Sequence, residues 1–447
     1  MKTFKIGGVH PPENKISSSV PIEILSPPQT VYIPLLQVLG APAVPVVEKG
    51  TRVFTGQLLA KGESFISANV HSSVSGIVSK IDEIIDTTGY KQKVIVIDND
   101  EKDEWVENID KTTVIKKDIN LSAEEIIKRI QEMGIVGLGG ATFPTHVKLM
   151  VPKDKKAEVL IINGVECEPY LTADHRLMLE KGEEILCGTS ILMKAIGVKR
   201  ALIGIENNKS DAIDNLKNLA KNYEGIEIHP LKVKYPQGGE KQLIQALTGR
   251  YVPSGKLPVE VGAIVNNVGT TYAVYEAIQK NKPLFERVVT VSGEKIAKPS
   301  NFLVRIGTPV SKLIEAAGGL PEDTFKVISG GPMMGKALSN IDTPVVKGTS
   351  GIIILTEREK NNKQQFNCIR CGKCITACPM GLQPYLLSSL SLKGYYDKLE
   401  ENNIMDCLEC GCCQYTCPAY IYLLDNLRTG KNKVSQIIKS REKEKVL

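Results

Sequence analysis

The sequence predicts a multidomain α/β protein that ends in a helical, cysteine-rich domain. The chain has 447 residues, too many for one hydrophobic core, so several domains are expected. Between residues 158 and 250, short apolar strands alternate with helical segments, an order typical of a mostly parallel sheet. Nine of the eleven cysteines follow residue 367, and in a reducing compartment such crowding favours metal binding over disulfides.

The overall composition gives no sign of a nucleic-acid partner or of a membrane span. The net charge is only +6 and is spread along the chain. No run approaches the roughly 18 apolar residues that cross a bilayer, and the first residues lack the apolar stretch of a signal peptide. We therefore expect a cytoplasmic protein. Residues 431–447 form a basic tail, expected to be a solvated end, with docking to a membrane or partner as the alternative.

Residues 1–110 are predicted to form a small all-β domain. Within residues 43–81, β-branched runs alternate with glycine-containing turns at regular spacing. The halves VEKGTRVFTGQLLA and NVHSSVSGIVSKI resemble the barrel-sandwich domains that carry lipoyl or biotinyl groups. The hairpin between them reads SFISAN and offers no lysine for modification, so only the fold is expected to be shared.

Residues 111–285 are predicted to form a Rossmann-like α/β domain. Ser122 and Glu125 form a capping box at the start of a helix that Gly134 ends. Three strands are then expected in EVLIIN, ALIGIE and IEIHPLKV, alternating with a long helix from about Asp174 and with helices over SDAIDNLKNLAK and GEKQLIQALTG. This alternation implies crossover connections and a mostly parallel sheet.

A glycine-rich loop in this domain, GIVGLGGATFPTHVK, is a candidate phosphate site. Gly137, Gly139 and Gly140 allow backbone N–H groups to approach a phosphate, and the start of a following helix adds favourable partial charge. Lys148 supplies a full positive charge. Taken alone, a plain turn is the better interpretation of this loop.

Three further loops strengthen the interpretation because they are placed where α/β sheets bind ligands. They read NGVECEP, YPQGGEKQ and VNNVGTTY. Asn163, Asn266 and Asn267 offer amide groups that suit the ribityl hydroxyls or ring edge of a flavin. Glu166 and Glu168 are two acids in a proline-punctuated loop, for which a solvent-facing turn is the alternative.

Residues 286–356 are predicted to form a compact β-grasp-like module. Strands from RVVTVSG, FLVRIG, FKVISGG and GIIIL surround one helix. A polar linker, TEREKNNKQQFN, then leads to the cysteines.

Two cysteine runs within residues 365–430 carry the most specific signal. Each reads C-x2-C-x2-C-x3-C followed by proline, the bacterial ferredoxin pattern for a pair of [4Fe–4S] clusters. Because the fourth cysteine of such a run ligates the neighbouring cluster, the ligand sets should cross. One cluster is predicted to take Cys368, Cys371, Cys374 and Cys417, and the other Cys407, Cys410, Cys413 and Cys378.

The crossing leaves Cys412 outside the repeat as a spare, structural thiol. Two zinc sites built from the CxxC elements are the alternative. A zinc site accepts four ligands at many spacings, so two identical runs with trailing prolines favour the iron–sulfur interpretation.

The four loops, in this order and followed by a β-grasp module, resemble the FMN- and NADH-binding subunit of respiratory complex I. The whole chain resembles more closely the RnfC family, which combines a barrel-sandwich start, a flavin domain, an SLBB-like β-grasp module and a two-cluster ferredoxin-type end. The resemblance implies a peripheral subunit on the cytoplasmic face of a membrane-bound, ion-translocating ferredoxin:NAD oxidoreductase. Such a subunit exchanges electrons between NAD(H), FMN and two [4Fe–4S] clusters, and it reaches ferredoxin through partner subunits.

The resemblance also implies roles for single residues, matched by position. The flavin phosphate loop takes Gly137, Gly139, Gly140 and Lys148. The other flavin contacts are Asn163, Glu166, Tyr235, Gly238, Asn266, Asn267 and Thr270. Positions at or near NADH are Phe143, Glu168, Glu240 and Lys256. The sequence departs from the complex I pattern at Leu138, Val165 and Gly239, where that pattern has an arginine, an acid and a glutamate.

Two other functions stay open at this stage. The departures favour a non-enzymatic electron relay with a vestigial flavin site, and a soluble flavin dehydrogenase component outside any membrane complex is a third possibility. NADH gives up two electrons as a hydride whereas a cubane accepts one, so a flavin is the physical converter between them. Hydride transfer needs no general acid or base, so no catalytic residue is predicted.

Overall fold

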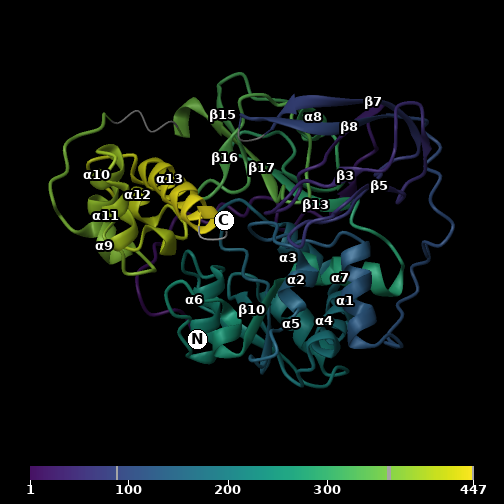
Figure 1. Ribbon diagram of the computed structural model, residues 1–447, viewed down its shortest axis with the longest axis horizontal. Helices are drawn as coiled ribbons and strands as arrows, with labels where there is room; N and C mark the ends of the chain where they lie inside the picture. Colours follow the sequence, from purple (N-terminus) through teal and green to yellow (C-terminus); the bar gives the residue numbers. More distant parts are fainter. Residues whose placement is uncertain (87–88, 360–363, 445–447) are drawn as a thin grey trace.

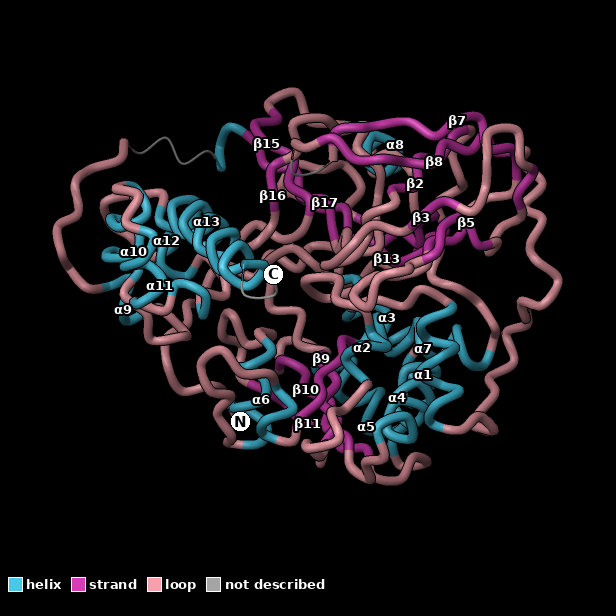
Figure 2. Tube along the Cα trace, in the orientation of Figure 1, coloured by secondary structure: helices cyan, strands magenta, loops and turns pink. Residues whose placement is uncertain are grey.

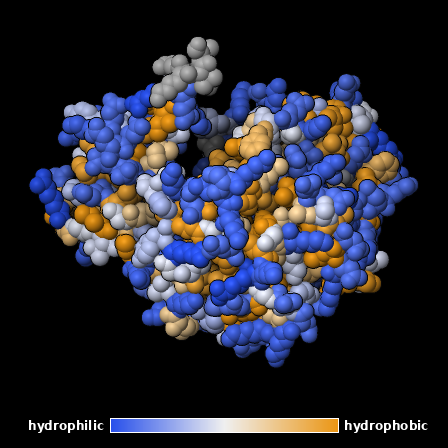
Figure 3. Space-filling model, turned by 60° about the horizontal axis from the view of Figure 1, so that its bottom comes forward, coloured by the Kyte–Doolittle hydropathy of each residue, from blue (hydrophilic) through white to orange (hydrophobic). Residues whose placement is uncertain are grey.

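The computed structural model describes residues 1–86, 89–359 and 364–444, and it has four domains (Figure 1). A helical domain at the carboxyl end forms one side of the molecule, an α/β domain forms the bottom of the view, and two β-rich domains lie side by side at the top. Figure 2 shows the same division, with strands gathered at the top and helices at the left and bottom. The face drawn in Figure 3 is mostly hydrophilic, with scattered hydrophobic patches. No helix among the described residues is long and apolar enough to cross a membrane.

The barrel domain (residues 25–110) is all β, as predicted. Antiparallel pairing builds one sheet in the order β2-β8-β7-β4 and a second in the order β3-β5-β6. Alternate residues of one strand, Val31 and Ile33, are fully buried because successive side chains of a strand point to opposite faces. The strands are β2 Thr30–Pro34, β3 Val44–Pro45, β4 Arg52–Val53, β5 Leu58–Lys61, β6 Val70–His71, β7 Gly76–Ile85 and β8 Lys91–Asn99.

The α/β domain (residues 111–285) has a fully parallel four-stranded sheet in the order β11-β10-β9-β12, which confirms the predicted alternation. Leu160 and Ile162 point into the large helical layer, whereas Val159 and Ile161 point toward α6 on the other face. The strands are β9 Val159–Asn163, β10 Ala201–Glu206, β11 Ile226–Leu231 and β12 Ala263–Asn267. The helices are α1 Ala123–Glu132, α2 Thr145–Leu149, α3 Ala173–Glu180, α4 Gly182–Ile196, α5 Ser210–Ala220, α6 Glu240–Thr248, η1 Pro258–Val261 and α7 Val268–Gln279.

Local signals fixed some boundaries of this domain and missed one. Ser122 and Glu125 form the predicted capping box at the start of α1. The expected long helix from about Asp174 is instead two helices, α3 and α4, separated at Lys181. Gly182 packs closely against α5, where a Cβ atom would lie 2.9 Å from the Leu219 side chain. The break therefore reflects a close approach between helices, which periodicity alone does not reveal.

The β-grasp domain (residues 286–356) has one helix and a mixed sheet in the order β1-β14-β13-β17-β15-β16. The unexpected member is β1 (Ile22–Ile24), which comes from the start of the chain and pairs in parallel with β14. The other elements are β13 Glu286–Ser292, β14 Ser300–Arg305, α8 Val310–Ala316, β15 Thr324–Ser329, β16 Lys336–Ala337, β17 Gly351–Thr356 and η2 Glu357–Glu359. Part of the predicted polar linker, residues 360–363, lies outside the described residues.

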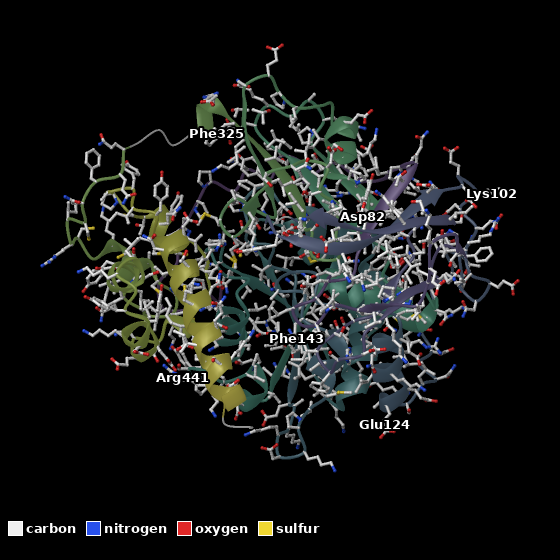
Figure 4. All side chains as sticks on the ribbon, turned by 45° about the horizontal axis from the view of Figure 1, so that its top comes forward. Asp82, Lys102, Glu124, Phe143, Phe325 and Arg441 are labelled. Atoms are coloured by element: carbon white, nitrogen blue, oxygen red, sulfur yellow. The ribbon has the colours of Figure 1, made fainter. Side chains whose placement is uncertain are left out.

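The cysteine domain (residues 364–444) is helical, with α9 Lys373–Ala377, α10 Pro384–Leu392, α11 Tyr396–Glu401, η3 Ile404–Asp406, α12 Cys412–Tyr415 and α13 Leu423–Glu444. Helix α13 runs through most of the segment predicted to be a solvated tail; residues 445–447 lie outside the described part. Val434 is fully buried, and Arg441 (Figure 4) forms ion pairs with Asp397 and Glu400 of α11. Sparse apolar residues at helical spacing, hidden among lysines, hold this helix against the domain.

The first residues of the chain do not join the barrel domain. Residues 2–24, named here the N-terminal strap, begin beside β11 and α6 and pass between the α/β and cysteine domains before entering the β-grasp sheet (Figure 1). The strap therefore contacts three domains.

Candidate functional site

The predicted flavin loops meet at the carboxyl ends of β9 and β12, the edge where parallel sheets bind ligands. Asn163 Nδ2 donates a hydrogen bond to the Gly238 carbonyl at 2.9 Å. Lys148 Nζ donates to the Val265 carbonyl at 2.9 Å and to Glu240 Oε1 at 3.0 Å. The structure thus brings together residues from all four loops.

Two neighbouring glycines of the glycine-rich loop differ in the space around them: Gly139 is tightly packed and Gly140 is not. A Cβ atom on Gly139 would lie 2.6 Å from Asn267 Nδ2, so this position admits only glycine. At Gly140 no heavy atom lies within 4 Å of such a Cβ. The Leu138 N–H donates to Thr270 Oγ1 at 2.8 Å, which anchors the loop on α7 and leaves its tip exposed.

One further observation, concerning the side-chain amide of Asn266, indicates that the residues at this edge fit flavin mononucleotide. Asn266 is buried, and its Nδ2 has no hydrogen-bond partner among the described residues. A buried amide donor without an acceptor is costly, so this group points to an acceptor on a ligand. Phe143, labelled in Figure 4, is half-buried in the same glycine-rich segment.

Two of the predicted flavin contacts have structural tasks. Asn267 caps α7 by accepting hydrogen bonds from the Gly269 and Thr270 N–H groups, and its Nδ2 donates to Asp174 Oδ2 at 2.6 Å. Glu166 caps α3 in a similar way, because its carboxylate accepts hydrogen bonds from the Asp174 and His175 N–H groups at 2.7 and 3.2 Å. Both side chains shape the loops by satisfying helix ends.

Glu168 lies at the contact between the α/β and β-grasp domains. Its carboxylate accepts hydrogen bonds from Tyr235 Oη at 3.1 Å and from the Met333 and Met334 N–H groups at 3.0 Å each. Burial raises the pKa of Glu168 above its ordinary value. In the structure this carboxylate holds an interdomain contact. Its predicted place near NADH stays a prediction.

Lys256 is the predicted residue that the structure leaves apart from the others. It is exposed in the loop after α6. The neighbouring Ser254 hydroxyl and Gly255 N–H donate to Asp406 of the cysteine domain. This loop is thus attached to the cysteine domain, and no contact of the Lys256 side chain among the described residues joins it to the flavin loops.

Cysteines of the two runs lie together in the structure, and which of them ligate which cluster stays a prediction. Five cysteines line one small cavity: Cys378, Cys407, Cys410, Cys412 and Cys413. Cys378, from the first run, thus lies with the second run. Cys417 packs in one cluster with Cys374 of the first run and Cys413 of the second. Burial raises the pKa of Cys374, and nearby Cys368 and Cys417 add to the shift. Among the described residues, no three metal-ligating side chains are placed to hold a single metal ion.

The two cysteine groups differ in exposure and in what they face. In the group of Cys368, Cys371, Cys374 and Cys417, named here the outer quartet, Cys368 and Cys371 are exposed. In the other predicted ligand group, Cys378, Cys407, Cys410 and Cys413, named here the inner quartet, all but Cys407 are buried. Cys410 and the spare Cys412 pack against Tyr235, next to the flavin loops. The inner quartet thus adjoins the flavin loops, and the outer quartet includes the two exposed cysteines.

Two lysines outside the recognised motifs, the half-buried Lys15 and the buried Lys209, hold the loop after β9. Lys15 Nζ donates to the carbonyls of Glu166, Glu168 and Leu171 at 2.8, 2.8 and 2.7 Å. Lys209 Nζ donates to the Val165 carbonyl at 2.9 Å from the other side. Burial, with Lys209 nearby, lowers the pKa of Lys15 to about 8. Sequence reasoning missed both residues because neither lies in a periodic or glycine-rich segment.

Family models match all four domains. A Nuo51 FMN-binding domain matches residues 130–276, and a 4Fe-4S dicluster domain matches residues 358–418. An RnfC barrel sandwich hybrid domain matches residues 2–102, and an SLBB domain matches residues 288–337. The chain is therefore an iron–sulfur flavoprotein in class, with FMN and two [4Fe–4S] clusters as the cofactors of its domains.

Relatives of nearly full length define the family. The chain is 50% identical over 410 residues, 91% of this chain and 88% of the relative, to a subunit of the proton-translocating ferredoxin:NAD(+) oxidoreductase complex of Clostridium ljungdahlii. It is 44% identical over 433 residues, 97% of each chain, to the corresponding subunit of the Na(+)-translocating complex of Acetobacterium woodii. An NAD+-reducing [NiFe]-hydrogenase structure is 18% identical, with a TM-score of 0.48 over 63% of this chain and 54% of that one. The chain belongs to the RnfC family, whose members are subunits of ion-translocating ferredoxin:NAD oxidoreductase complexes.

The crossed ligand sets make a sharp prediction for paired substitutions. In Cys378→Ser/Cys407→Ser both changes fall in the inner quartet, so the protein should keep one cubane and about four of its eight irons. In Cys368→Ser/Cys378→Ser each quartet loses a ligand, so both clusters should be impaired. Iron and acid-labile sulfide analysis of anaerobically purified protein measures both. Equal iron loss in the two variants would contradict the crossing.

Asp174 predicts a pH-dependent stability. Burial, followed by the neighbouring Glu166, raises the pKa of Asp174 to about 7. The folded state therefore prefers the protonated acid, and this contribution to stability is lost as pH rises from about 4 through about 7. In the flavin-free protein, Asp174→Asn should raise the melting temperature at pH 8, and the gain should shrink toward pH 5. Asp154→Asn, where the side chain is 75% exposed, is the control; a gain for Asp174→Asn that does not change with pH would refute the assignment.

Proposed function

We propose that this chain is a peripheral subunit, on the cytoplasmic face of the membrane, of an ion-translocating ferredoxin:NAD oxidoreductase. It exchanges electrons between NAD(H), FMN and two [4Fe–4S] clusters and passes them to partner subunits, through which ferredoxin is reached. The observation that carries the proposal is the packing of Tyr235, a residue of the flavin loops, against Cys410 of the inner quartet. Tyr235, Cys410 and Cys412 belong to one buried cluster, so the flavin loops and the inner quartet adjoin there.

In this proposal each loop has one task at the flavin. Bound FMN supplies the conversion between hydride transfer and single-electron transfer. Gly137, Gly139, Gly140 and Lys148 hold its phosphate, and Asn266 donates an amide hydrogen bond for which the described residues offer no acceptor. Asn163, Gly238 and Thr270 line the same edge, while Glu166 and Asn267 keep the loops in shape through the helix caps. Phe143 and Glu240 border the side assigned to NADH.

The chain also separates the inner redox centres from water. Tyr235 is 3% exposed, and three of the inner cysteines lie within the interior. The outer quartet has two exposed thiols, so electrons enter or leave the protein there, next to a partner subunit. In a dry interior fewer dipoles must reorient when charge moves, which suits electron transfer at the inner site.

An electron relay with a vestigial flavin site is the second candidate function. It is supported by the burial of Leu138 and Val165, which stand where the complex I pattern has charged residues, and by the interdomain bonds of Glu168. A relay would contain the clusters but would give no flavin response to NADH.

NADH titration of the anaerobically purified protein separates the two functions. Under the proposal, NADH bleaches the flavin absorbance and then reduces the clusters, and Asn266→Ala weakens FMN binding to the flavin-free protein about three- to tenfold, since one hydrogen bond contributes about 0.5–1.5 kcal/mol. Asn222→Ala, at an exposed position, is the matched control and should bind FMN normally. Protein that binds no FMN after reconstitution, or whose bound flavin is not bleached by NADH, would rule the proposal out in favour of the relay.

A further inference from the structure

The N-terminal strap is fastened along the edge of the α/β domain. Lys2 pairs with Leu231 of β11, and Thr3 Oγ1 donates to Gln237 Oε1 at 2.7 Å. Phe4 is buried, with the Lys234 Nζ atom 4.1 Å from the centre of its ring. These contacts fix the strap next to the loop that contains Tyr235.

Gly7, Gly8 and Val9 bridge the flavin loops and the inner quartet. Val9 and Tyr235 exchange both of their backbone hydrogen bonds at 2.9 Å. One residue earlier, the Gly8 N–H donates to the Ala377 carbonyl at 2.9 Å. A Cβ atom on Gly7 would lie 2.4 Å from the carbonyl oxygen of Cys378, a member of the inner quartet. The strap is therefore wedged between Tyr235 on one side and a cluster ligand on the other.

The strap continues into the loop after β9. Lys15 holds three carbonyls of that loop, and the Tyr170 N–H donates to the Glu13 carbonyl at 2.9 Å. One short segment of chain thus touches the flavin loops at two places and the inner quartet between them. Backbone hydrogen bonds of this kind fix a separation more firmly than contacts between long side chains, which retain rotamer freedom.

Contacts that involve side chains also attach the cysteine domain, to the α/β domain through Asp406 and Gln242 and to the β-grasp domain through Arg428. Gln242 Nε2 donates to the Pro379 carbonyl at 3.2 Å, and Arg428 donates to the Met334 carbonyl at 2.8 Å. Gly411 packs against the Met333 carbonyl, where a Cβ atom would lie at 2.9 Å. These contacts dock the cysteine domain, whereas among the described residues the strap alone joins Tyr235 to the Cys378 segment through main-chain bonds.

We propose that Gly7, Gly8 and Val9 are positioning residues that set the separation between the flavin and the inner cluster. The inference rests on the proposed function. The step concerned moves one electron from reduced flavin to the oxidised inner cluster. Two such transfers, with loss of the flavin's protons to water, restore oxidised flavin, and each reduces one cluster by one electron. Because electron transfer slows steeply with distance, a displacement of about 1 Å is enough to affect it, as for other reactions that depend on proximity.

The test compares two glycine-to-alanine variants of the full holoprotein. Gly7 and Gly50 both have positive φ, +68° and +88°, so alanine strains the backbone at either position. The new methyl group meets Cys378 in Gly7→Ala and meets nothing within 4 Å in Gly50→Ala. We expect NADH to reduce the flavin at the wild-type rate in both variants, and the later reduction of the clusters to be several-fold slower in Gly7→Ala alone, as followed by stopped-flow absorbance.

Two measurements that do not depend on turnover accompany the kinetics. Hydrogen–deuterium exchange should rise in residues 374–382 and 235–240 of Gly7→Ala and stay unchanged there in Gly50→Ala. The EPR spectrum of the dithionite-reduced protein should change for the inner cluster only. If Gly7→Ala loses its iron, Gly8→Ala replaces it in the test. The methyl group of Gly8→Ala would lie 2.9 Å from the Tyr235 carbonyl oxygen, on the side of the strap opposite to Cys378.

The outcomes separate this inference from the proposed function. The inference is overturned if Gly7→Ala and Gly8→Ala both match Gly50→Ala in the rate of cluster reduction and in hydrogen–deuterium exchange. The proposed function would then remain intact. Wild-type flavin that does not respond to NADH would overturn the function, and the exchange and EPR comparisons would still decide whether the strap positions the cluster segment.

Discussion

The arrangement of the redox sites depends on the surroundings of one buried residue, Tyr235. Its backbone pairs with Val9 of the strap, its hydroxyl donates to Glu168, and its ring packs beside Cys410 and Cys412. Three chain segments that are far apart in sequence therefore meet at one side chain. Because packed interiors transmit displacements instead of absorbing them, movement of any of these segments alters the separation of the two sites.

Lysines bonded to backbone carbonyls hold the surrounding loops. Lys15 and Lys209 fasten the loop after β9. Lys347 does the same at the junction of three domains, where its Nζ donates to the carbonyls of Asn69 and Gly134 at 2.7 Å each, and burial lowers its pKa to about 7. A buried ammonium group is costly unless it is hydrogen-bonded, so each of these lysines both needs and fixes its acceptors. The loops are thus ordered by residues outside the recognised motifs.

The sequence predicted those features whose cause is local. The cysteine runs specify their own spacing, and the alternation of strands and helices specifies a parallel sheet whose carboxyl edge gathers the loops. The capping box of Ser122 and Glu125 is likewise a local signal. The predicted roles of Glu166 and Asn267 differ from what the structure emphasises, because the helix ends that they cap are known only once the loops are folded.

Features that depend on contacts between residues far apart in the chain could not be predicted from the sequence pattern. The strap has no periodicity, and the partners of Gly7, Gly8 and Val9 lie more than 200 residues away, so these residues look like ordinary loop residues. In α13, Leu427 and Val434 form an apolar stripe that the surrounding lysines conceal, which made the segment look like a solvated tail.

The central claim is that two crossed cubanes lie in line with the flavin loops, the inner one behind Tyr235. Anomalous diffraction at the iron edge, on crystals of the holoprotein grown without oxygen, tests it most directly. The account predicts two four-iron peaks, one inside the cavity of Cys378, Cys407, Cys410 and Cys413 and the other at the outer quartet. Single-metal peaks, or a cluster that Cys378 shares with Cys368, would contradict it.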